Sequence, residues 1–388
     1  MKRIMTIYGT RPEAIKVAPV IKALEESEHF ESLPVVTGQH REMLKQVNDL
    51  FGIEPVADLA IMTQDQTLNQ ILAKVITGID EQLAAHEPDA VIVQGDTSTV
   101  MGASIASFNR RIPVVHVEAG LRSGDIDSPF PEEANRKLTA QVARVHLAPT
   151  AESKNNLLAE GVAEGDIVVT GNTVIDALMA AVEKPVPFTD PRLEEFAASD
   201  KPMVLVTTHR RENLGENMVQ IGRAVNYLAV EHPEYCFVLP IHKNPKVREV
   251  VMPQIEGLDN VLTVEPLDYA EFTHLISAAR FVLTDSGGVQ EEAPSLGIPV
   301  LVLRENTERP EAVESGTVRL IGTRYETIVT ESRRLMRDPE HFRSMANAVN
   351  PYGDGKAASR TVAALESFFG LGQRMAAFSP TSEARSEQ

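Results

Sequence analysis

A chain of 388 residues, 43% of them hydrophobic, has enough apolar surface for two packed cores rather than one. Its formal net charge of −18 excludes broad nucleic-acid binding, because a phosphate backbone needs a basic face, and admits an anionic small ligand only where cations are concentrated locally. A single cysteine excludes a disulfide framework or a cysteine metal site, and the short apolar runs favour a soluble cytoplasmic protein over a secreted or membrane-spanning one.

Short apolar, β-branched runs alternate with helical patterns along the chain. In the first half they lie at residues 3–9, 33–38, 90–96, 112–120, 145–149 and 166–172. A Pro-Val-Pro segment at 185–187 precedes a second series, at residues 202–209, 235–242, 260–266, 280–288, 298–303 and 317–322. Continuous apolar runs are typical of parallel strands covered on both faces. With helices between them, such as 12–26, 41–51 and 99–109, they predict an α/β fold of two Rossmann-like doubly wound domains with a central cleft.

The restart of the pattern also predicts the domain boundaries. We expect an N-terminal domain at residues 1–172 and a C-terminal domain at 173–356. The last helix, at about 357–370, is expected to pack back on the N-terminal domain. The polar, small-residue tail at 371–388 is predicted to be disordered.

The stretch TDSGGVQEEAPSLGIPVLVL, residues 284–303, predicts an anion site at the end of a strand. Ser286, Gly287 and Gly288 form a turn before a helix expected to start near Val289, so backbone N–H groups and a helix N-terminus meet there. One turn further on, Glu292 can accept hydrogen bonds from a ribose diol. The alternative is a plain tight turn with a helix N-cap. Neither GxGxxG nor GxxxxGK[ST] follows a strand here, which argues against a nicotinamide cofactor or ATP in their usual places.

Three further strand ends carry cations. They are Arg11 and Lys16 after the first strand, then His209, Arg210 and Arg211 in the segment THRRE at 208–212, and finally His242 with Lys243. Surface salt bridges are the alternative for each of them. Because the carboxyl ends of parallel strands share one edge of a sheet, the four loops together predict a site of about diphosphate size.

Three carboxylates lie at strand ends or turns of the first half. Asp96 follows the strand at 90–96, Glu118 ends the next strand, and Glu132 lies in SPFPEEANR. The alternative to a catalytic role is that each carboxylate lies on a solvated face. Asp96 could also be a helix N-cap. Partly buried neighbouring carboxylates can work as acids and bases. Their spacing does not support a metal site. Together with the anion loops, these residues favour a nucleotide-sugar enzyme.

The whole set of motifs resembles the non-hydrolysing bacterial UDP-N-acetylglucosamine 2-epimerases. The matching stretches run in order from residue 9 to about 355: GTRPEAIK, QGDTSTV, HVEAGLRSGD, SPFPEEANR, TGNTVIDAL, THRRENLGE, HKNPKVRE, TDSGGVQEEAPSLGIPVLVLRENTERPEAVESGT and NPYGDG. The resemblance implies a glycosyltransferase-B-type fold, a homodimer, and interconversion of UDP-GlcNAc and UDP-ManNAc without NAD or metal. It also implies elimination of UDP to an enzyme-bound 2-acetamidoglucal, re-addition, and a role in supplying ManNAc for cell-surface polysaccharide.

Carried over residue by residue, the resemblance implies two sets of site residues. The catalytic positions are Asp96, Glu118, Glu132 and His209. The positions around UDP or the sugar are Arg11, Lys16, His242, Ser286, Gly287, Gly288, Glu292 and Arg309. Which carboxylate takes the C2 proton stays open.

A third set concerns activation by the substrate. The resemblance implies an allosteric role for Gln39, Gln66 and Arg210. Two positions depart from the common pattern, because Glu42 and Asp65 stand where a glutamine and an arginine are usual. Added negative charge repels a diphosphate, so we expect activation by UDP-GlcNAc to be weakened or absent.

Three other functions fit parts of the sequence. A hydrolysing epimerase would release UDP and free ManNAc, and the match to the non-hydrolysing set disfavours it. A retaining glycosyltransferase shares the fold and the ribose glutamate but needs an acceptor. A non-catalytic UDP-sugar sensor has no need to keep the acid–base residues.

Overall fold

Seven parallel strands form the first sheet of the computed structural model, which describes residues 1–38, 41–63, 65–197, 199–307 and 309–380. The strand order is β3-β2-β1-β4-β5-β6-β7. The strands are β1 (Lys2–Tyr8), β2 (Phe30–Val36), β3 (Ala57–Asp58), β4 (Ala90–Gln94), β5 (Val114–Val117), β6 (Val145–Ala148) and β7 (Ile167–Val169). All neighbours pair in parallel, so the carboxyl ends of the strands lie at one edge, where doubly wound sheets bind ligands.

Helices cover both faces of this sheet. They are α1 (Arg11–Glu25), α2 (Arg41–Phe51), α3 (Leu68–His86), α4 (Ser98–Asn109), α5 (Glu132–Val142), α6 (Ala151–Ala159), α7 (Thr173–Val182) and α16 (Ala357–Phe368). Side chains alternate along a strand, and on β1 Ile4 joins one buried cluster while Met5 and Ile7 join another. This explains why the strands are apolar throughout: each buries side chains in a core on either face.

Six parallel strands form the second sheet, in the order β10-β9-β8-β11-β12-β13. They are β8 (Met203–Thr207), β9 (Cys236–Pro240), β10 (Val261–Val264), β11 (Ala279–Thr284), β12 (Val300–Val302) and β13 (Val318–Leu320). The helices are α8 (Pro191–Ala197), α9 (Glu216–Glu231), α10 (Pro245–Ile255), α11 (Tyr269–Ala278), α12 (Gly287–Ser295), α13 (Pro310–Glu314), α14 (Tyr325–Arg337) and α15 (Pro339–Ala346). Both sheets confirm the predicted Rossmann-like α/β fold.

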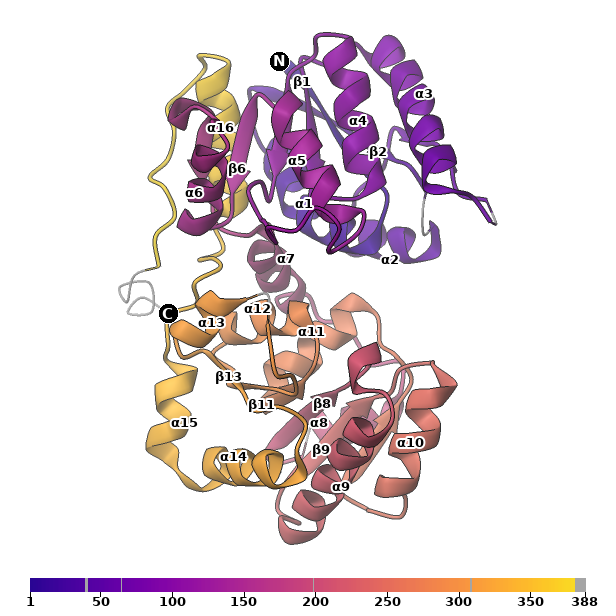
Figure 1. Cartoon of the computed structure of the whole chain (residues 1–388), viewed down its shortest axis with the longest axis vertical. Coiled ribbons are helices and arrows are strands. Elements are labelled where there is room, and N and C mark those ends of the chain that lie inside the picture. Colours follow the sequence, from indigo (N-terminus) through magenta and orange to yellow (C-terminus); the bar gives the residue numbers. More distant parts are fainter. Residues whose placement is uncertain (39–40, 64, 198, 308, 381–388) are drawn as a thin grey trace. The chain divides into compact units, whose positions relative to one another are not determined.

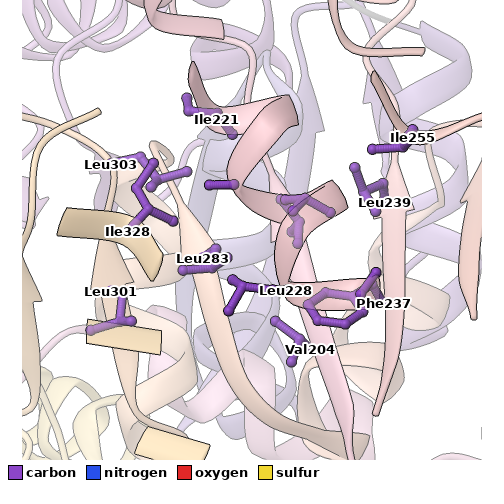
Figure 2. Close-up of a cluster of buried hydrophobic side chains, with 14 of the residues drawn as sticks. Val204, Ile221, Leu228, Phe237, Leu239, Ile255, Leu283, Leu301, Leu303 and Ile328 are labelled. Carbon is purple, nitrogen blue, oxygen red and sulfur yellow. The ribbon is translucent and has the colours of Figure 1, made fainter. Parts of the chain in front are cut away.

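A single buried cluster joins strands and helices of the second sheet. Leu228 of α9 packs among Val204, Phe237 and Leu283, which come from three neighbouring strands (Figure 2). Ile328 brings α14 into the same cluster. This core supports the strand ends that carry the candidate ligand-binding loops.

The chain divides into two compact units, each built around one of the sheets (Figure 1). The first unit holds Met1–Ala177 and Tyr352–Ser379, and the second holds Leu178–Pro351. The division therefore falls inside α7, whereas a boundary after residue 172 was predicted. In the first unit α16 packs on α1, with Ala364 and Leu365 beside Val20 and Leu24 in one core. None of the helices in the described ranges is both long and apolar enough to cross a membrane.

The segment after α16 makes specific contacts with the first unit as far as Phe378. The backbone N–H of Phe378 donates to Val169 at 2.8 Å, and Arg374 donates to Gly165 at 2.6 Å. The Phe378 ring is 7% exposed. Composition predicts disorder for residues 371–388, whereas Arg374 and Phe378 make defined contacts with the first unit. The remainder of the predicted disordered tail, 381–388, lies outside the described residues.

Candidate active site

Asp96 and Glu118 follow two neighbouring strands of the first sheet. Strand β4 pairs directly with β5; Asp96 is the second residue after β4, and Glu118 immediately follows β5. Gly95 turns the chain with a φ of +82°, a conformation that suits glycine. Glu118 has a φ of +64°, which costs a residue with a Cβ on the order of 1–3 kcal/mol. Such strain at a candidate catalytic carboxylate is typical of functional sites, and surrounding contacts must hold it.

Two side chains hold the Glu118 carboxylate. Lys16 on α1 forms an ion pair with Glu118 Oε2, and Gln94 Nε2 donates to the same oxygen at 2.8 Å. Both partners of the ion pair are largely buried, with side chains 17% and 13% exposed. The structure therefore places Lys16, which the resemblance assigns to the UDP or sugar, beside a candidate catalytic carboxylate.

Three side chains hold Asp96 and the preceding Gly95. Arg136 Nη2 lies 2.6 Å from the Asp96 carboxylate. Asn135 Nδ2 donates to the Asp96 carbonyl at 2.8 Å, and His116 Nε2 lies 2.7 Å from the carbonyl of Gly95. Side chains from β5 and α5 thus fix both the backbone and the carboxylate of Asp96.

Thr97, and not Asp96, caps helix α4. The Thr97 hydroxyl accepts a hydrogen bond from a backbone N–H of the first turn, so the N-cap alternative for Asp96 is wrong. The same hydroxyl donates to Glu13 Oε1 at 2.5 Å, while Glu13 Oε2 accepts from the N–H groups of Gly9 and Thr10. Burial raises the pKa of Glu13, and these hydrogen bonds oppose the rise. Glu13 thereby ties the loop after β1, which leads into α1, to the loop that carries Asp96.

Two buried histidines lie side by side beneath these loops. His116 on β5 is the direct neighbour of His146 on β6. Burial lowers the pKa of His116 to about 3 and that of His146 to about 4. His116 is therefore neutral at ordinary pH, and it must carry its proton on Nε2 because the Gly95 carbonyl can only accept.

The two glutamates of SPFPEEANR have different surroundings. Glu132 is the first residue of α5 and is half-buried. Glu133 is fully buried, and its Oε2 accepts from the Ser123 N–H at 3.1 Å and from Arg136 at 3.2 Å. Glu133 is therefore the one joined through Arg136 to Asp96, a link that the sequence did not reveal. Over the described ranges, no three His, Cys, Asp or Glu side chains are grouped to hold a metal ion.

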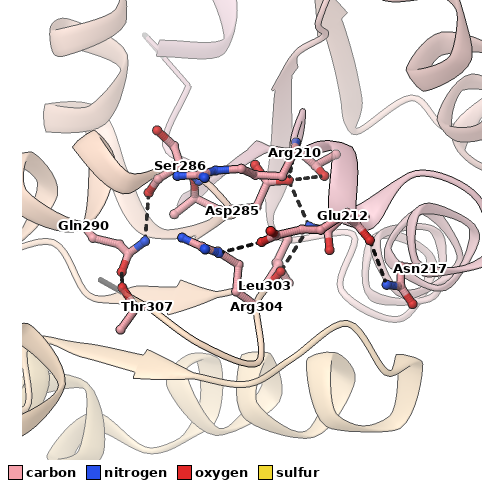
Figure 3. Close-up of polar contacts among 12 residues, drawn as sticks. Arg210, Glu212, Asn217, Asp285, Ser286, Gln290, Leu303, Arg304 and Thr307 are labelled. Atoms are coloured by element: carbon pink, nitrogen blue, oxygen red, sulfur yellow. Dashed lines mark hydrogen bonds and ion pairs between the residues drawn. The ribbon is translucent and has the colours of Figure 1, made fainter. Parts of the chain in front are cut away.

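In the second unit, Asp285 joins the loops after β8 and β11 (Figure 3). Its carboxylate is fully buried. Its oxygens accept from the backbone N–H groups of His209 and Arg210, the Thr208 hydroxyl and the Asn213 amide, all at 2.9–3.1 Å. Burial raises the pKa of Asp285, but hydrogen bonds and the nearby His209 outweigh it and hold the pKa below its usual value. An ionised, fully bonded carboxylate thus fixes the loop that carries His209.

The glycine loop forms the N-terminus of α12, which begins at Gly287, two residues before the predicted start. The Ser286 side chain makes no capping hydrogen bond. A Cβ on Gly287 would lie 2.6 Å from the Arg309 guanidinium, whereas a Cβ on Gly288 would meet nothing within 4 Å. Arg309 Nε is held by Glu291 Oε1 at 2.6 Å. Gly287 therefore admits Arg309 to the helix N-terminus, where a guanidinium and backbone N–H groups favour an anion.

The remaining candidates of the second unit lie near these loops. Glu292 is buried, and Tyr269 Oη lies 3.4 Å from its Oε1. The rings of His209 and His242 stack, with centroids 5.8 Å apart and an interplanar angle of 21°. The backbone N–H of Asn244 donates to His242 Nδ1 at 3.1 Å. Glu292 thus lies on α12, while His209 and His242 follow the neighbouring strands β8 and β9.

The three candidate allosteric residues are placed differently. Gln39 lies outside the described residues. Gln66 is engaged within its own loop, where its Oε1 accepts from the Thr63 N–H at 2.6 Å and its Nε2 donates to Ile61 at 3.1 Å. Arg210 contacts Asp285 through its backbone N–H, and the Arg210 guanidinium takes no part in that hydrogen bond.

Comparison with known proteins gives a consistent result. A family model described as UDP-N-acetylglucosamine 2-epimerase matches residues 22–366. A UDP-N-acetylglucosamine 2-epimerase of Escherichia coli K12 is 50% identical over 370 residues, covering 94% of this chain and 98% of the relative. The UDP-GlcNAc 2-epimerase of Neisseria meningitidis, solved with UDP-GlcNAc, is 46% identical with a TM-score of 0.83 over 94% of this chain and 100% of that one. The S. aureus MnaA–UDP structure is 45% identical with a TM-score of 0.85 over 98% of this chain and 100% of that one. Sequence, fold and the order of the motifs agree, and the chain belongs to the UDP-N-acetylglucosamine 2-epimerase family.

Proposed function

We propose that this chain interconverts UDP-GlcNAc and UDP-ManNAc without hydrolysing either, by eliminating UDP and adding it back. The observation that carries the proposal is Glu118, held in a strained conformation by Lys16 and Gln94 on the strand next to Asp96. Support comes from family membership and from the relatives solved with UDP-GlcNAc and with UDP. The enzyme would act in the cytoplasm and supply ManNAc units for cell-surface polysaccharide.

The proposed reaction balances without an oxidant or reductant. A base removes the C2 proton as the C1–O bond breaks; the C2–H electron pair becomes the C1=C2 double bond of 2-acetamidoglucal, and the C1–O pair leaves with UDP. In the return step a UDP oxygen attacks C1 and a proton is delivered to the other face of C2. Because C2–H beside an acetamido group is not acidic, proton removal must accompany departure of UDP.

Inversion at C2 needs proton transfer on both faces of the sugar. Asp96 and Glu118 suit this requirement, because separate sets of side chains hold them at two adjacent strand ends. Glu132, at the start of α5, is a third candidate from the resemblance. Each direction of the reaction would use one carboxylate as base and another group as acid.

The departing UDP carries negative charge that the second unit is suited to stabilise. The N-terminus of α12 offers backbone N–H groups beside the Arg309 guanidinium, and Gly288 has no neighbour within 4 Å of where a Cβ would lie. The buried Glu292 would accept hydrogen bonds from the ribose. The resemblance also assigns Arg11 and His242 to positions around UDP or the sugar.

We also propose a homodimer, as the resemblance implies. Large apolar side chains are exposed on the first unit, among them Phe108 at 56% on α4 and Leu138 at 54% on α5. Burial in an interface would stabilise such side chains. Light scattering at micromolar concentration should give twice the 42.5 kDa chain mass, and a monomer mass would refute the dimer.

Product analysis in ordinary water separates the candidate functions. With UDP-GlcNAc alone, the proposed enzyme should produce UDP-ManNAc while free UDP stays below the enzyme concentration. Accumulation of UDP with free ManNAc would identify a hydrolysing epimerase. Turnover only after an acceptor sugar is added would identify a glycosyltransferase, and no turnover with retained UDP binding would identify a sensor.

A further inference from the structure

The two stacked histidines of the second unit hold their ring protons on different nitrogens. A backbone N–H can only donate, so the contact from Asn244 N–H to His242 Nδ1 at 3.1 Å requires a lone pair on Nδ1. The neutral His242 ring therefore carries its proton on Nε2. Its exposed edge presents an N–H donor.

His209 has the opposite environment. Its Nδ1 lies 3.2 Å from Asp285 Oδ1, and Asp285 is buried and ionised. An ionised carboxylate can only accept, so Nδ1 of His209 must carry a proton. In the neutral ring, Nε2 is then left with a lone pair. The His209 side chain is 41% exposed.

The carboxylate that sets this arrangement is itself immobile. Besides the imidazole, Asp285 accepts from the Thr208 hydroxyl, from two backbone N–H groups and from the Asn213 amide (Figure 3). Asn213 also donates to the Leu303 carbonyl at 3.1 Å, which fixes the amide in turn. The backbone of His209 and its ring are thus bound to the same group, and this restricts both the position and the rotation of the imidazole.

We propose that Asp285 is the positioning residue of His209, holding the neutral ring as the Nδ1–H tautomer and offering Nε2 to the substrate, while the stacked His242 offers Nε2–H. The role of these rings in the reaction rests on the proposed epimerase function. The tautomers themselves do not, since they exist without substrate. A ring held in this way accepts a proton at Nε2 and, once charged, is stabilised by Asp285. It can then pair with the negative charge that develops on the departing diphosphate.

Nitrogen-15 NMR of histidine-labelled protein, without ligand and at about pH 9 where ordinary histidines are neutral, tests the proposal directly. A His209→Gln variant assigns the His209 signals. We expect a proton on Nδ1 and a lone pair on Nε2 for His209, and the reverse for His242. A His209 ring protonated on Nε2 in the wild-type protein would overturn the proposal, whatever the enzyme's activity.

A pair of variants separates positioning from loop stability. Asp285→Asn can turn its amide N–H₂ toward Nδ1, so we expect the Nε2–H tautomer to appear and kcat to fall by about 100-fold or more. Thr208→Val removes one hydrogen bond to the other carboxylate oxygen and leaves the imidazole contact in place. It should keep the wild-type tautomer. An unchanged His209 tautomer in a folded Asp285→Asn protein would also refute the positioning role of Asp285. If that variant does not fold, the tautomer seen in the wild-type spectrum still tests the proposal.

Discussion

The buried histidine pair should make the first unit less stable as the pH falls below about 6.5. Burial depresses the pKa of His116 to about 3 and of His146 to about 4. Between these values and about 6.5 the unfolded chain binds protons that the folded chain does not, so stability rises with pH and is lost on acidification. At about pH 5, 1.5 units below the unfolded value, each ring should cost about 2 kcal/mol relative to about pH 7.5.

The variant His146→Gln isolates half of this effect. It removes one titrating ring and leaves the His116 contact to the Gly95 carbonyl in place. Other groups also titrate in this range: burial raises the pKa of Asp176 to about 6, which stabilises the folded state as the pH falls toward 3.8. Since the variant keeps Asp176, the difference between the two proteins reports only the histidine.

Hydrogen exchange measured by mass spectrometry over a urea series gives the free energy of opening for peptides from β5 and β6. The measurement is made at about pH 7.5 and about pH 5, and the intrinsic amide exchange rates are corrected for the difference in pH. We expect the wild-type protein to lose about 2 kcal/mol more than His146→Gln on acidification. An equal loss in the two proteins would mean that His146 is not buried as a neutral ring.

Further outcomes follow from single contacts in the two units. A Cβ at Gly287 would lie 2.6 Å from the Arg309 guanidinium, which Glu291 holds, so Gly287→Ala should displace that group and lower the stability of the second unit. Gly288→Ala should leave urea unfolding unchanged and weaken UDP binding by about 10-fold or more. Equal effects of both variants on stability would contradict this difference. Leu365→Ala should cost the first unit about 2–5 kcal/mol, measured by urea unfolding, because α16 is part of its core; a loss confined to the second unit would contradict the assignment. With Glu42 and Asp65 adding negative charge, initial rates on UDP-ManNAc alone should be hyperbolic, and a sigmoidal curve abolished by traces of UDP-GlcNAc would disprove weakened activation.

The sheets could be predicted from the sequence because parallel strands buried on both faces leave an unmistakable pattern. Every long apolar run became a strand, and Asp96 and Glu118 follow two adjacent strands. Strand β3 was missed because it has two residues at the edge of the sheet, too few to produce a periodic signal.

The contacts that hold the candidate site were beyond the sequence. Asp285 looked like the end of a strand. Only the fold shows that it accepts hydrogen bonds from four groups of another loop and lies 3.2 Å from the Nδ1 of His209. A charged residue between an apolar strand and a glycine pair was the available signal. Lys16 was assigned to an anionic ligand because a sequence shows a cation near a helix N-terminus but not the carboxylate, Glu118, that approaches it from another strand.

For the C-terminal segment, amino-acid composition predicts less order than the structure shows. Residues 372–380 are polar and small, which predicts disorder. The buried ring of Phe378 lies against the first unit, and Arg360 donates to the Ala376 carbonyl at 3.0 Å. Composition averages over a segment and does not register individual contacts such as those of Phe378, Arg374 and Arg360.

Proton NMR in heavy water with UDP-GlcNAc, comparing the wild-type protein with Glu118→Gln, tests the central claim most directly. The wild-type protein should form UDP-ManNAc with deuterium at C2 of both sugars. Glu118→Gln should abolish the exchange at C2 and bind UDP with a dissociation constant within about threefold of wild type. Epimerisation without deuterium at C2, or full exchange in Glu118→Gln, would contradict the account.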